Sequence, residues 1–188
     1  MSESVQTVAP TASPVTLGDL RAHLRITGHD EDAYLQALID MAVDALQAKA
    51  WRQFCTATYT MQFDDWADEL RLPRPPLATV TSVKYYDTSE VLQTLATSVY
   101  EVITDQTPGL IRLKYQQTWP ALRGHPDDIL ITYTCGSSAA AVPSRTKQAV
   151  KLLAAHHYQQ RTPVVVGRTV VEIPMGIMWL LDRSGVPV

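Results

Sequence analysis

Hydrophobic positions between residues 30 and 54 recur with the spacing of a helix. The apolar residues are Leu35, Leu38, Ile39, Ala42, Ala45, Leu46 and Ala50, which follow the i, i+3, i+4, i+7 pattern of one helix face. Asp30 is a suitable N-cap, and Lys49 and Arg52 place positive charge near the last turn. The pattern predicts a long helix over residues 30–54, roughly 35 Å in length at about 1.5 Å per residue.

Two further stretches have helical patterns. Thr16 and Asp19 stand at the spacing of a capping box, which predicts a short helix over residues 17–26. Ser144, as N-cap, opens a third helix over residues 144–161, whose apolar residues would face the long helix.

Between the long helix and the third helix the period changes from 3.6 to 2. Tyr59, Met61 and Phe63 alternate with polar neighbours, as in a half-buried strand. Further strands are expected at residues 69–72, 79–86, 99–103, 110–115 and 129–135, for six or seven in all. The expected fold is therefore α+β: a small helical bundle carrying an inserted antiparallel β-subdomain and a C-terminal arm.

These patterns divide the chain into four parts. Residues 1–15 are small and polar with two prolines, and we expect them to be disordered. Residues 16–56 and 137–161 would form the helical core, with the β-subdomain at 57–136 between them. Residues 162–188 would form the arm.

Composition narrows the class of protein. The 188-residue chain has a net charge of −3, which argues against wrapping of nucleic acid in a basic groove but not against a ring through which DNA passes. Cys55 and Cys135 form no CxxC pair, so we expect two buried thiols rather than a disulfide framework. No secretory signal or membrane-spanning run is recognisable, so we expect synthesis in a reducing cytoplasm and no membrane contact.

Candidate catalytic or metal-binding residues are few. Four carboxylates, at Asp64, Asp65, Asp68 and Glu69, resemble a magnesium site of a nuclease, but no base or phosphate-binding Lys is close in sequence. His156 and His157 are adjacent on a helix and diverge by about 100°, which is unsuited to sharing a metal. We expect solvated turns and packing here, and no enzyme, cofactor or metal.

Among these segments, the C-terminal arm is the best candidate for a binding surface. Its segment from Pro174 to Leu181 is apolar almost all round. Burial of each large side chain on a partner would contribute about 1.5–3 kcal/mol. The alternative is that the arm folds back on its own core.

The order of these segments resembles the head–tail connector, or adaptor, proteins of tailed bacteriophages, in the larger subgroup with a β-rich insertion. The resemblance spans roughly residues 16–183. It rests most on the segment LPRPPLATVTSVKYYD at Leu72–Asp87 and on PMGIMWLL at Pro174–Leu181.

The resemblance implies a role in particle assembly. About twelve copies would form a ring beneath the portal ring, with a channel through which DNA passes without sequence-specific binding. The arm would dock on the portal, and another face would receive a stopper or tail-completion protein at the head–tail junction of the virion. By this resemblance the portal-facing residues are Ile173, Met175, Ile177, Trp179, Leu180 and Leu181.

Two other functions stay open on the sequence. A DNA-binding or packaging accessory protein would need a basic surface built from Arg21, Arg25, Arg52, Lys147, Lys151 and Arg161. A metal-dependent nuclease would need the carboxylates at 64–69 to converge.

Overall fold

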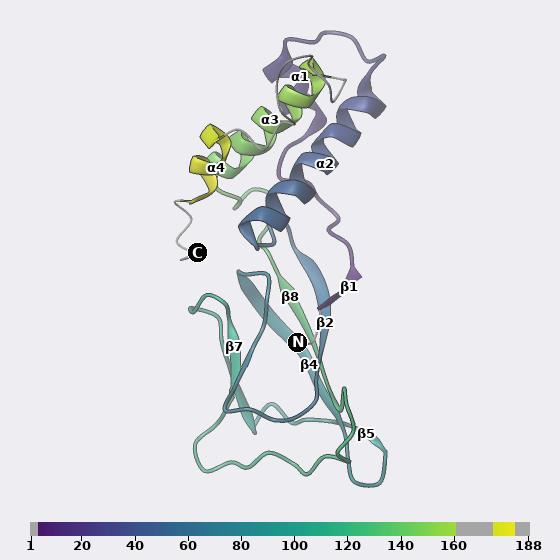
Figure 1. Cartoon of the computed structure of the whole chain (residues 1–188), viewed down its shortest axis with the longest axis vertical. Helices are drawn as coiled ribbons and strands as arrows, with labels where there is room; N and C mark the ends of the chain where they lie inside the picture. The colour runs from purple at the N-terminus through teal and green to yellow at the C-terminus, as the bar shows by residue number, and fades with distance from the viewer. Residues whose placement is uncertain (1–3, 161–174, 183–188) are drawn as a thin grey trace, which may run out of the picture. The chain divides into compact units, whose positions relative to one another are not determined.

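A computed structural model describes residues 4–160 and 175–182 of the chain (Figure 1). The fold is α+β, with four helices and eight strands in these ranges. The chain separates into two compact units. We call residues 1–12 with 51–137 the β unit, and residues 13–50 with 138–188 the helical unit.

The helical unit is a small bundle. Its helices are α1 (Leu17–Leu24), α2 (Asp32–Ala50), α3 (Ser144–Gln159) and α4 (Met175–Asp182). Helix α3 packs against each of the other three. The apolar stripe predicted for the long helix is the face that is buried, with Leu35, Leu38, Ile39, Ala42 and Leu46 all in the core.

The helix ends agree only in part with the prediction. The capping box at Thr16 and Asp19 is confirmed, since the Asp19 N–H donates to Thr16 Oγ1 at 3.1 Å and the Thr16 N–H donates to the Asp19 carboxylate at 3.1 Å. Helix α2 begins at Asp32 rather than Asp30, because the chain still turns there, with the Asp32 N–H on the His29 carbonyl. It ends at Ala50, because Trp51 takes a left-handed φ of 50°. The N-cap of α3 is Pro143, not Ser144, and makes no side-chain hydrogen bond.

The β unit contains two antiparallel sheets. The larger has the order β1-β2-β8-β4-β5, formed by Val5–Val8, Ala57–Phe63, Ile129–Cys135, Leu77–Tyr86 and Leu92–Thr94. The smaller has the order β3-β7-β6, formed by Glu69–Arg71, Leu110–Leu113 and Tyr100–Ile103.

Both sheets bury side chains in one core. In β8 the residues Ile129, Ile131, Tyr133 and Cys135 are buried and alternate with half-buried ones, as the period of 2 predicts. Leu70 and Ile111 of the smaller sheet belong to the same cluster. Burial raises the pKa of the Cys135 thiol to about 12, so this group stays protonated at neutral pH.

Two strands were not expected from the sequence. Residues 1–15 were predicted to be disordered, but Val5–Val8 form strand β1, which pairs antiparallel with β2 (Figure 1). Strand β5 was also missed. All side chains of both strands are exposed, so neither strand shows the alternation that marks a half-buried strand.

The segment between the two core helices closes on itself. The Ser137 N–H donates to the Phe54 carbonyl at 3.0 Å, and the Thr56 N–H donates to the Ser137 carbonyl at 3.1 Å. Gly136 makes this closure possible, because its φ is +89° and a Cβ there would lie 2.5 Å from the Cys55 carbonyl oxygen. The segment therefore begins and ends at neighbouring points.

Candidate functional site

Helix α4 carries most of the residues expected to bind a partner. Ile177 and Leu181, one turn apart, are both 5% exposed, and the helix packs against α3. Leu180 is half-buried, and Gly176 is exposed. Ile173 lies outside the described residues, as do the side chains of Met175 and Trp179. The structure thus brings Ile177 and Leu181 together on one face, which the helical unit covers.

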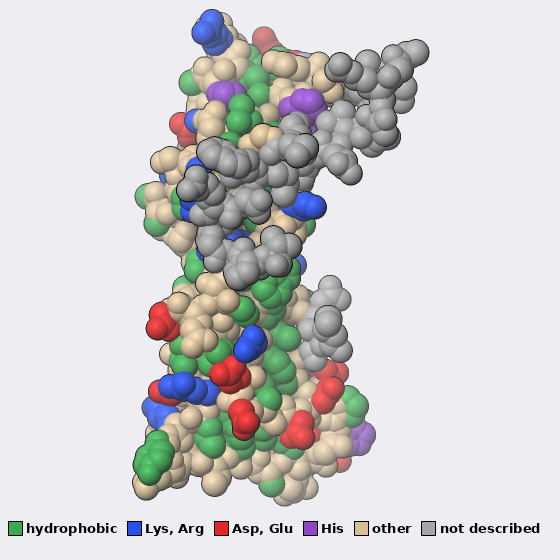
Figure 2. Space-filling model, turned by 60° about the vertical axis from the view of Figure 1, so that its left-hand side comes forward, with side chains coloured by type: hydrophobic (Ala, Val, Ile, Leu, Met, Phe, Trp, Pro, Cys, Tyr) green, Lys and Arg blue, Asp and Glu red, His purple; other side chains and the backbone are tan. Residues whose placement is uncertain are grey.

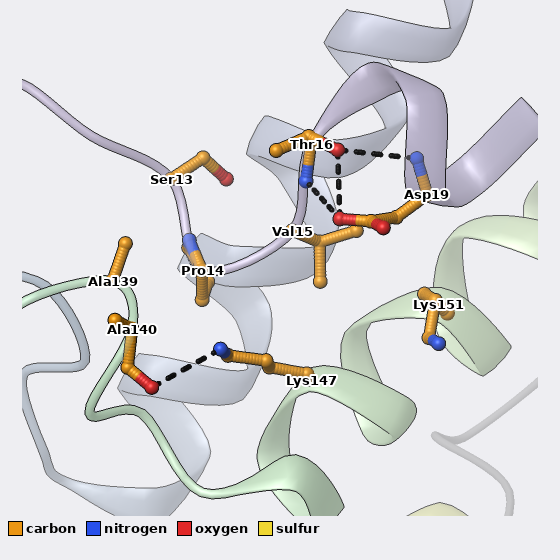
Figure 3. A pocket seen from close by; sticks show the side chains of 9 residues that line it. All are labelled: Ser13, Pro14, Val15, Thr16, Asp19, Ala139, Ala140, Lys147 and Lys151. Atoms are coloured by element: carbon orange, nitrogen blue, oxygen red, sulfur yellow. Dashed lines mark hydrogen bonds between the residues drawn. The ribbon is translucent and has the colours of Figure 1, made fainter.

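A hollow of about 350 Å³ lies elsewhere in the helical unit (Figure 3). Lys147 and Lys151 of α3 lie on one side of it, and Thr16 and Asp19 at the start of α1 lie on the other. The pKa of Asp19 is lowered, first by the hydrogen bond from the Thr16 side chain and next by the one from the Thr16 backbone. Burial acts to raise this pKa, whereas the ammonium groups of Lys151 and Lys147 lower it further. Because the Asp19 carboxylate is near both cations, the charges of this hollow are partly balanced within the unit.

The carboxylates considered for a nuclease serve the local backbone. Asp64 accepts a hydrogen bond from the Asp127 N–H at 3.0 Å, and Asp65 accepts one from the Trp66 N–H at 2.7 Å. Glu69 forms an ion pair with Arg71 at 3.1 Å. Within residues 4–160 and 175–182, no three His, Cys, Asp or Glu side chains gather as metal ligands would. Asp64, Asp65 and Glu69 thus make contacts within turns and on the surface of the β unit.

Asp128 is a buried polar residue whose role was not predicted from the sequence. It is fully buried and accepts hydrogen bonds from the Gly124 and His125 N–H groups, each at 2.9 Å, and from the Arg123 guanidinium. Burial acts to raise the pKa of Asp128, but these three donors outweigh it and hold the pKa below the ordinary value. Asp128 thereby fixes the loop that precedes β8. The available signal was an Asp directly before a confident buried strand.

Trp119 packs within the β unit. Its ring lies parallel to that of Trp66, with centroids 4.4 Å apart, and the Trp66 indole N–H donates to the Pro120 carbonyl at 2.9 Å. Trp119 is therefore part of the scaffold.

The basic residues considered for DNA binding are partly engaged. Arg21 forms an ion pair with Asp32 at 3.5 Å, and the Lys147 ammonium donates to the Ala140 carbonyl at 3.4 Å. Arg161 lies outside the described residues. In the β unit, Figure 2 shows Lys and Arg side chains interspersed with Asp and Glu on the visible face. None of the described helices is long and apolar enough to cross a membrane.

Three solved structures similar to this chain come from gene transfer agent particles. A chain from the neck of an empty gene transfer agent particle, computed with C6 symmetry, matches with a TM-score of 0.79 and 26% identity over 96% of this chain and 94% of that one. A chain from the virion of the native particle matches with a TM-score of 0.76 and 25% identity over 96% and 93%. A chain from the native neck, computed with C12 symmetry, matches with a TM-score of 0.72 and 26% identity over 97% and 93%. The fold is thus shared with structural components of a phage-like particle.

The sequence then identifies the family. A family model described as phage gp6-like head-tail connector protein matches residues 14–107, which is half of the chain. The chain belongs to this family of head–tail connectors, as its resemblance to them indicated. No curated protein matches the sequence significantly.

Proposed function

We propose that this chain is a structural connector of a tailed phage or phage-like particle. About twelve copies form a ring beneath the portal, with a channel for DNA and a docking surface for the next stopper or tail component. The observation that carries the proposal is the likeness to a neck chain over nearly the whole length, at a TM-score of 0.79, together with the family match.

The symmetry of the related necks, whose structures were computed with C6 and C12 symmetry, supports a ring. A net charge of −3 suits a ring through which DNA slides, because a strongly basic lining would hold the phosphates. The protein would be made in the host cytoplasm and would act in the virion by assembly, without catalysis.

The arm is proposed to bind the portal through Ile173, Met175, Ile177, Trp179, Leu180 and Leu181. Ile177 and Leu181 are buried in the helical unit, so contact through these two requires α4 to leave α3. Leu180 is partly accessible without that step. Weak docking of each arm becomes strong in a ring, because many arms engage one portal at once.

The test is co-sedimentation with the portal ring of the same particle. We expect the full-length chain to sediment in a fixed ratio to portal subunits and Leu180→Glu to be lost from the pellet. Leu92→Glu, which alters an exposed leucine on β5, should still sediment. Circular dichroism checks that each variant is folded.

The outcomes separate the parts of the proposal. If the full-length chain does not sediment with the portal, the connector function proposed here is wrong. If Leu180→Glu binds as well as the unchanged chain, the ring docks through another surface and the assignment of Leu180 is wrong.

A further inference from the structure

We propose that neighbouring copies join through the edges of the larger sheet. The outer edge of β1 in one copy pairs antiparallel with the stretch Ala78–Ser82 of β4 in the next. This inference rests on the proposed ring and names the contact between its copies.

Strand β4 has a long free edge. It spans ten residues, but β5 pairs only with Lys84–Tyr86, and a hydrogen bond from the Leu95 N–H to the Val83 carbonyl at 2.8 Å adds one residue. On the side away from β8, residues 78–82 have no strand partner among the residues that the structure describes. Ala78, Thr79 and Thr81 are exposed. The backbone groups of this stretch are therefore available to another strand.

Strand β1 forms the opposite edge of the sheet. Its valines are largely exposed, Val5 at 60% and Val8 at 54%. Proteins usually protect such edges with charged residues or proline, but neither Val5–Val8 nor Ala78–Ser82 contains any. The β4 edge is interrupted by bulges at Ala78 and Thr81. They limit the added strand to a short one, and β1 has only four residues.

The pairing registers place the two edges at the same level of the sheet. On one side of β8, Thr134 pairs with Thr79 of β4, and Thr132 pairs with Ser82. On its other side, Thr134 pairs with Thr58 of β2, which in turn pairs with Val8 of β1. Thr132 pairs in the same way with Thr60, which pairs with Val5. Each neighbouring pair in this series is antiparallel, so β1 and β4 run in opposite directions. Copies placed side by side therefore bring the two edges together antiparallel, with Val8 opposite Thr79.

The other free edge of the sheet is that of β5, and pairing of β1 with this edge does not fit a closed ring. Tyr85, the centre of the β4–β5 pairing, faces Ile129, whereas Tyr59 beside β1 faces Tyr133. At about 3.3 Å per residue this offset would shift each copy by roughly 13 Å along the strands. Repeated shifts produce an open helix, whereas a closed ring needs contacts without such a step.

The first experiment tests the predicted neighbours by disulfide formation. Full-length Val8→Cys and Thr79→Cys proteins are mixed under the conditions of assembly and oxidised. Residues opposite each other in an antiparallel pair have Cα atoms about 4.5–5.5 Å apart, within the range of a disulfide. The native Cys55 and Cys135 are buried and should not interfere.

We expect a heterodimer from the mixture, none from either variant alone, and a ladder of larger species from a chain carrying both substitutions. Absence of the heterodimer in assembled protein overturns the proposal. A Thr79→Cys homodimer also overturns it, because that contact would be two-fold rather than head-to-tail.

A second experiment uses charge. Val8→Lys should weaken self-association at least tenfold, whereas Leu92→Lys on the β5 edge should leave it unchanged. Thermal unfolding checks that both variants fold. Equal self-association of the two variants contradicts the proposed edge contact.

Failure of this inference differs from failure of the proposed function. If the chain sediments with the portal but Val8→Cys and Thr79→Cys do not cross-link there, the edge contact is wrong and the connector role stands. If the cross-link forms without any portal binding, the edge contact stands and the connector role is wrong.

Discussion

At the scale of single residues, Asp128 shows how one buried carboxylate organises a loop. Replacing it with Asn removes the charge that the Arg123 guanidinium and two backbone N–H groups contact. We expect Asp128→Asn to lower Tm by several degrees at neutral pH, because Arg123 loses its ion pair. Asp127→Asn, on the adjacent exposed residue, should change Tm little, and equal losses would contradict the role given to Asp128.

The same carboxylate predicts a pH dependence. The pKa of Asp128 is held below the ordinary value of 3.8, so the charged group favours the folded state. This stabilisation is complete above that pH and is lost as the pH falls through the lower pKa of the folded protein. In acid titrations followed by circular dichroism, the Tm difference between the unchanged chain and Asp128→Asn should therefore shrink below about pH 4. A constant difference down to pH 2 would disagree with this sign.

Two glycines with similar φ values allow the cost of a left-handed backbone to be compared with the cost of a steric clash. Gly136 and Gly124 have φ values of +89° and +86°, but an added Cβ would meet the Cys55 carbonyl at Gly136 and nothing within 4 Å at Gly124. Gly124→Ala should cost about 1–2 kcal/mol of unfolding free energy, from the left-handed conformation alone. Gly136→Ala should cost about 3 kcal/mol or more. Urea unfolding measures both, and similar costs would show that the backbone near Cys55 can shift.

At the scale of elements, the two predicted helix caps provide a direct comparison. Thr16 bonds the first turn of α1, whereas no side-chain cap serves the start of α3. Thr16→Ala should lower the unfolding free energy by about 1 kcal/mol. Ser144→Ala should change it by less than about 0.5 kcal/mol. A larger loss at Ser144 than at Thr16 in urea unfolding would reverse this assignment.

Elements were predictable from the sequence where one face is buried. The stripe of α2 and the alternation of β8 carry the positions of their buried residues directly, because burial selects apolar side chains at the matching period. Strands β1 and β5 have no buried side chain and depend on backbone pairing, which any uncharged short segment can make. They could not be found without knowing where the neighbouring strand lies.

For the arm, the sequence predicted which residues are buried but not what covers them. The apolar segment at 174–181 predicted burial, and Ile177 and Leu181 are buried. The sequence could not say whether a partner or the chain's own α3 covers them, because both interfaces select the same apolar residues. Asp128 was not predicted, because its position before a strand does not by itself tell a buried carboxylate that holds a loop from a solvated one.

At the scale of the whole molecule, charge decides between passage and binding of DNA. With a net charge of −3 and Arg21 engaged by Asp32, we expect no retention of duplex DNA at physiological salt. Filter binding over a range of salt concentrations measures this. Tight binding would instead favour the packaging accessory function, if the logarithm of the binding constant falls steeply with the logarithm of the salt concentration.

The closure between Phe54 and Ser137 also makes the intervening segment a cassette. Because its two ends are already hydrogen-bonded to each other, a gene could lose or exchange the stretch 56–136 without leaving the flanking helices with widely separated ends. Strand β1 is the exception, since it belongs to the N-terminal segment yet depends on β2 within the cassette. Any exchange of the cassette between related connectors would therefore have to bring a compatible N-terminus with it.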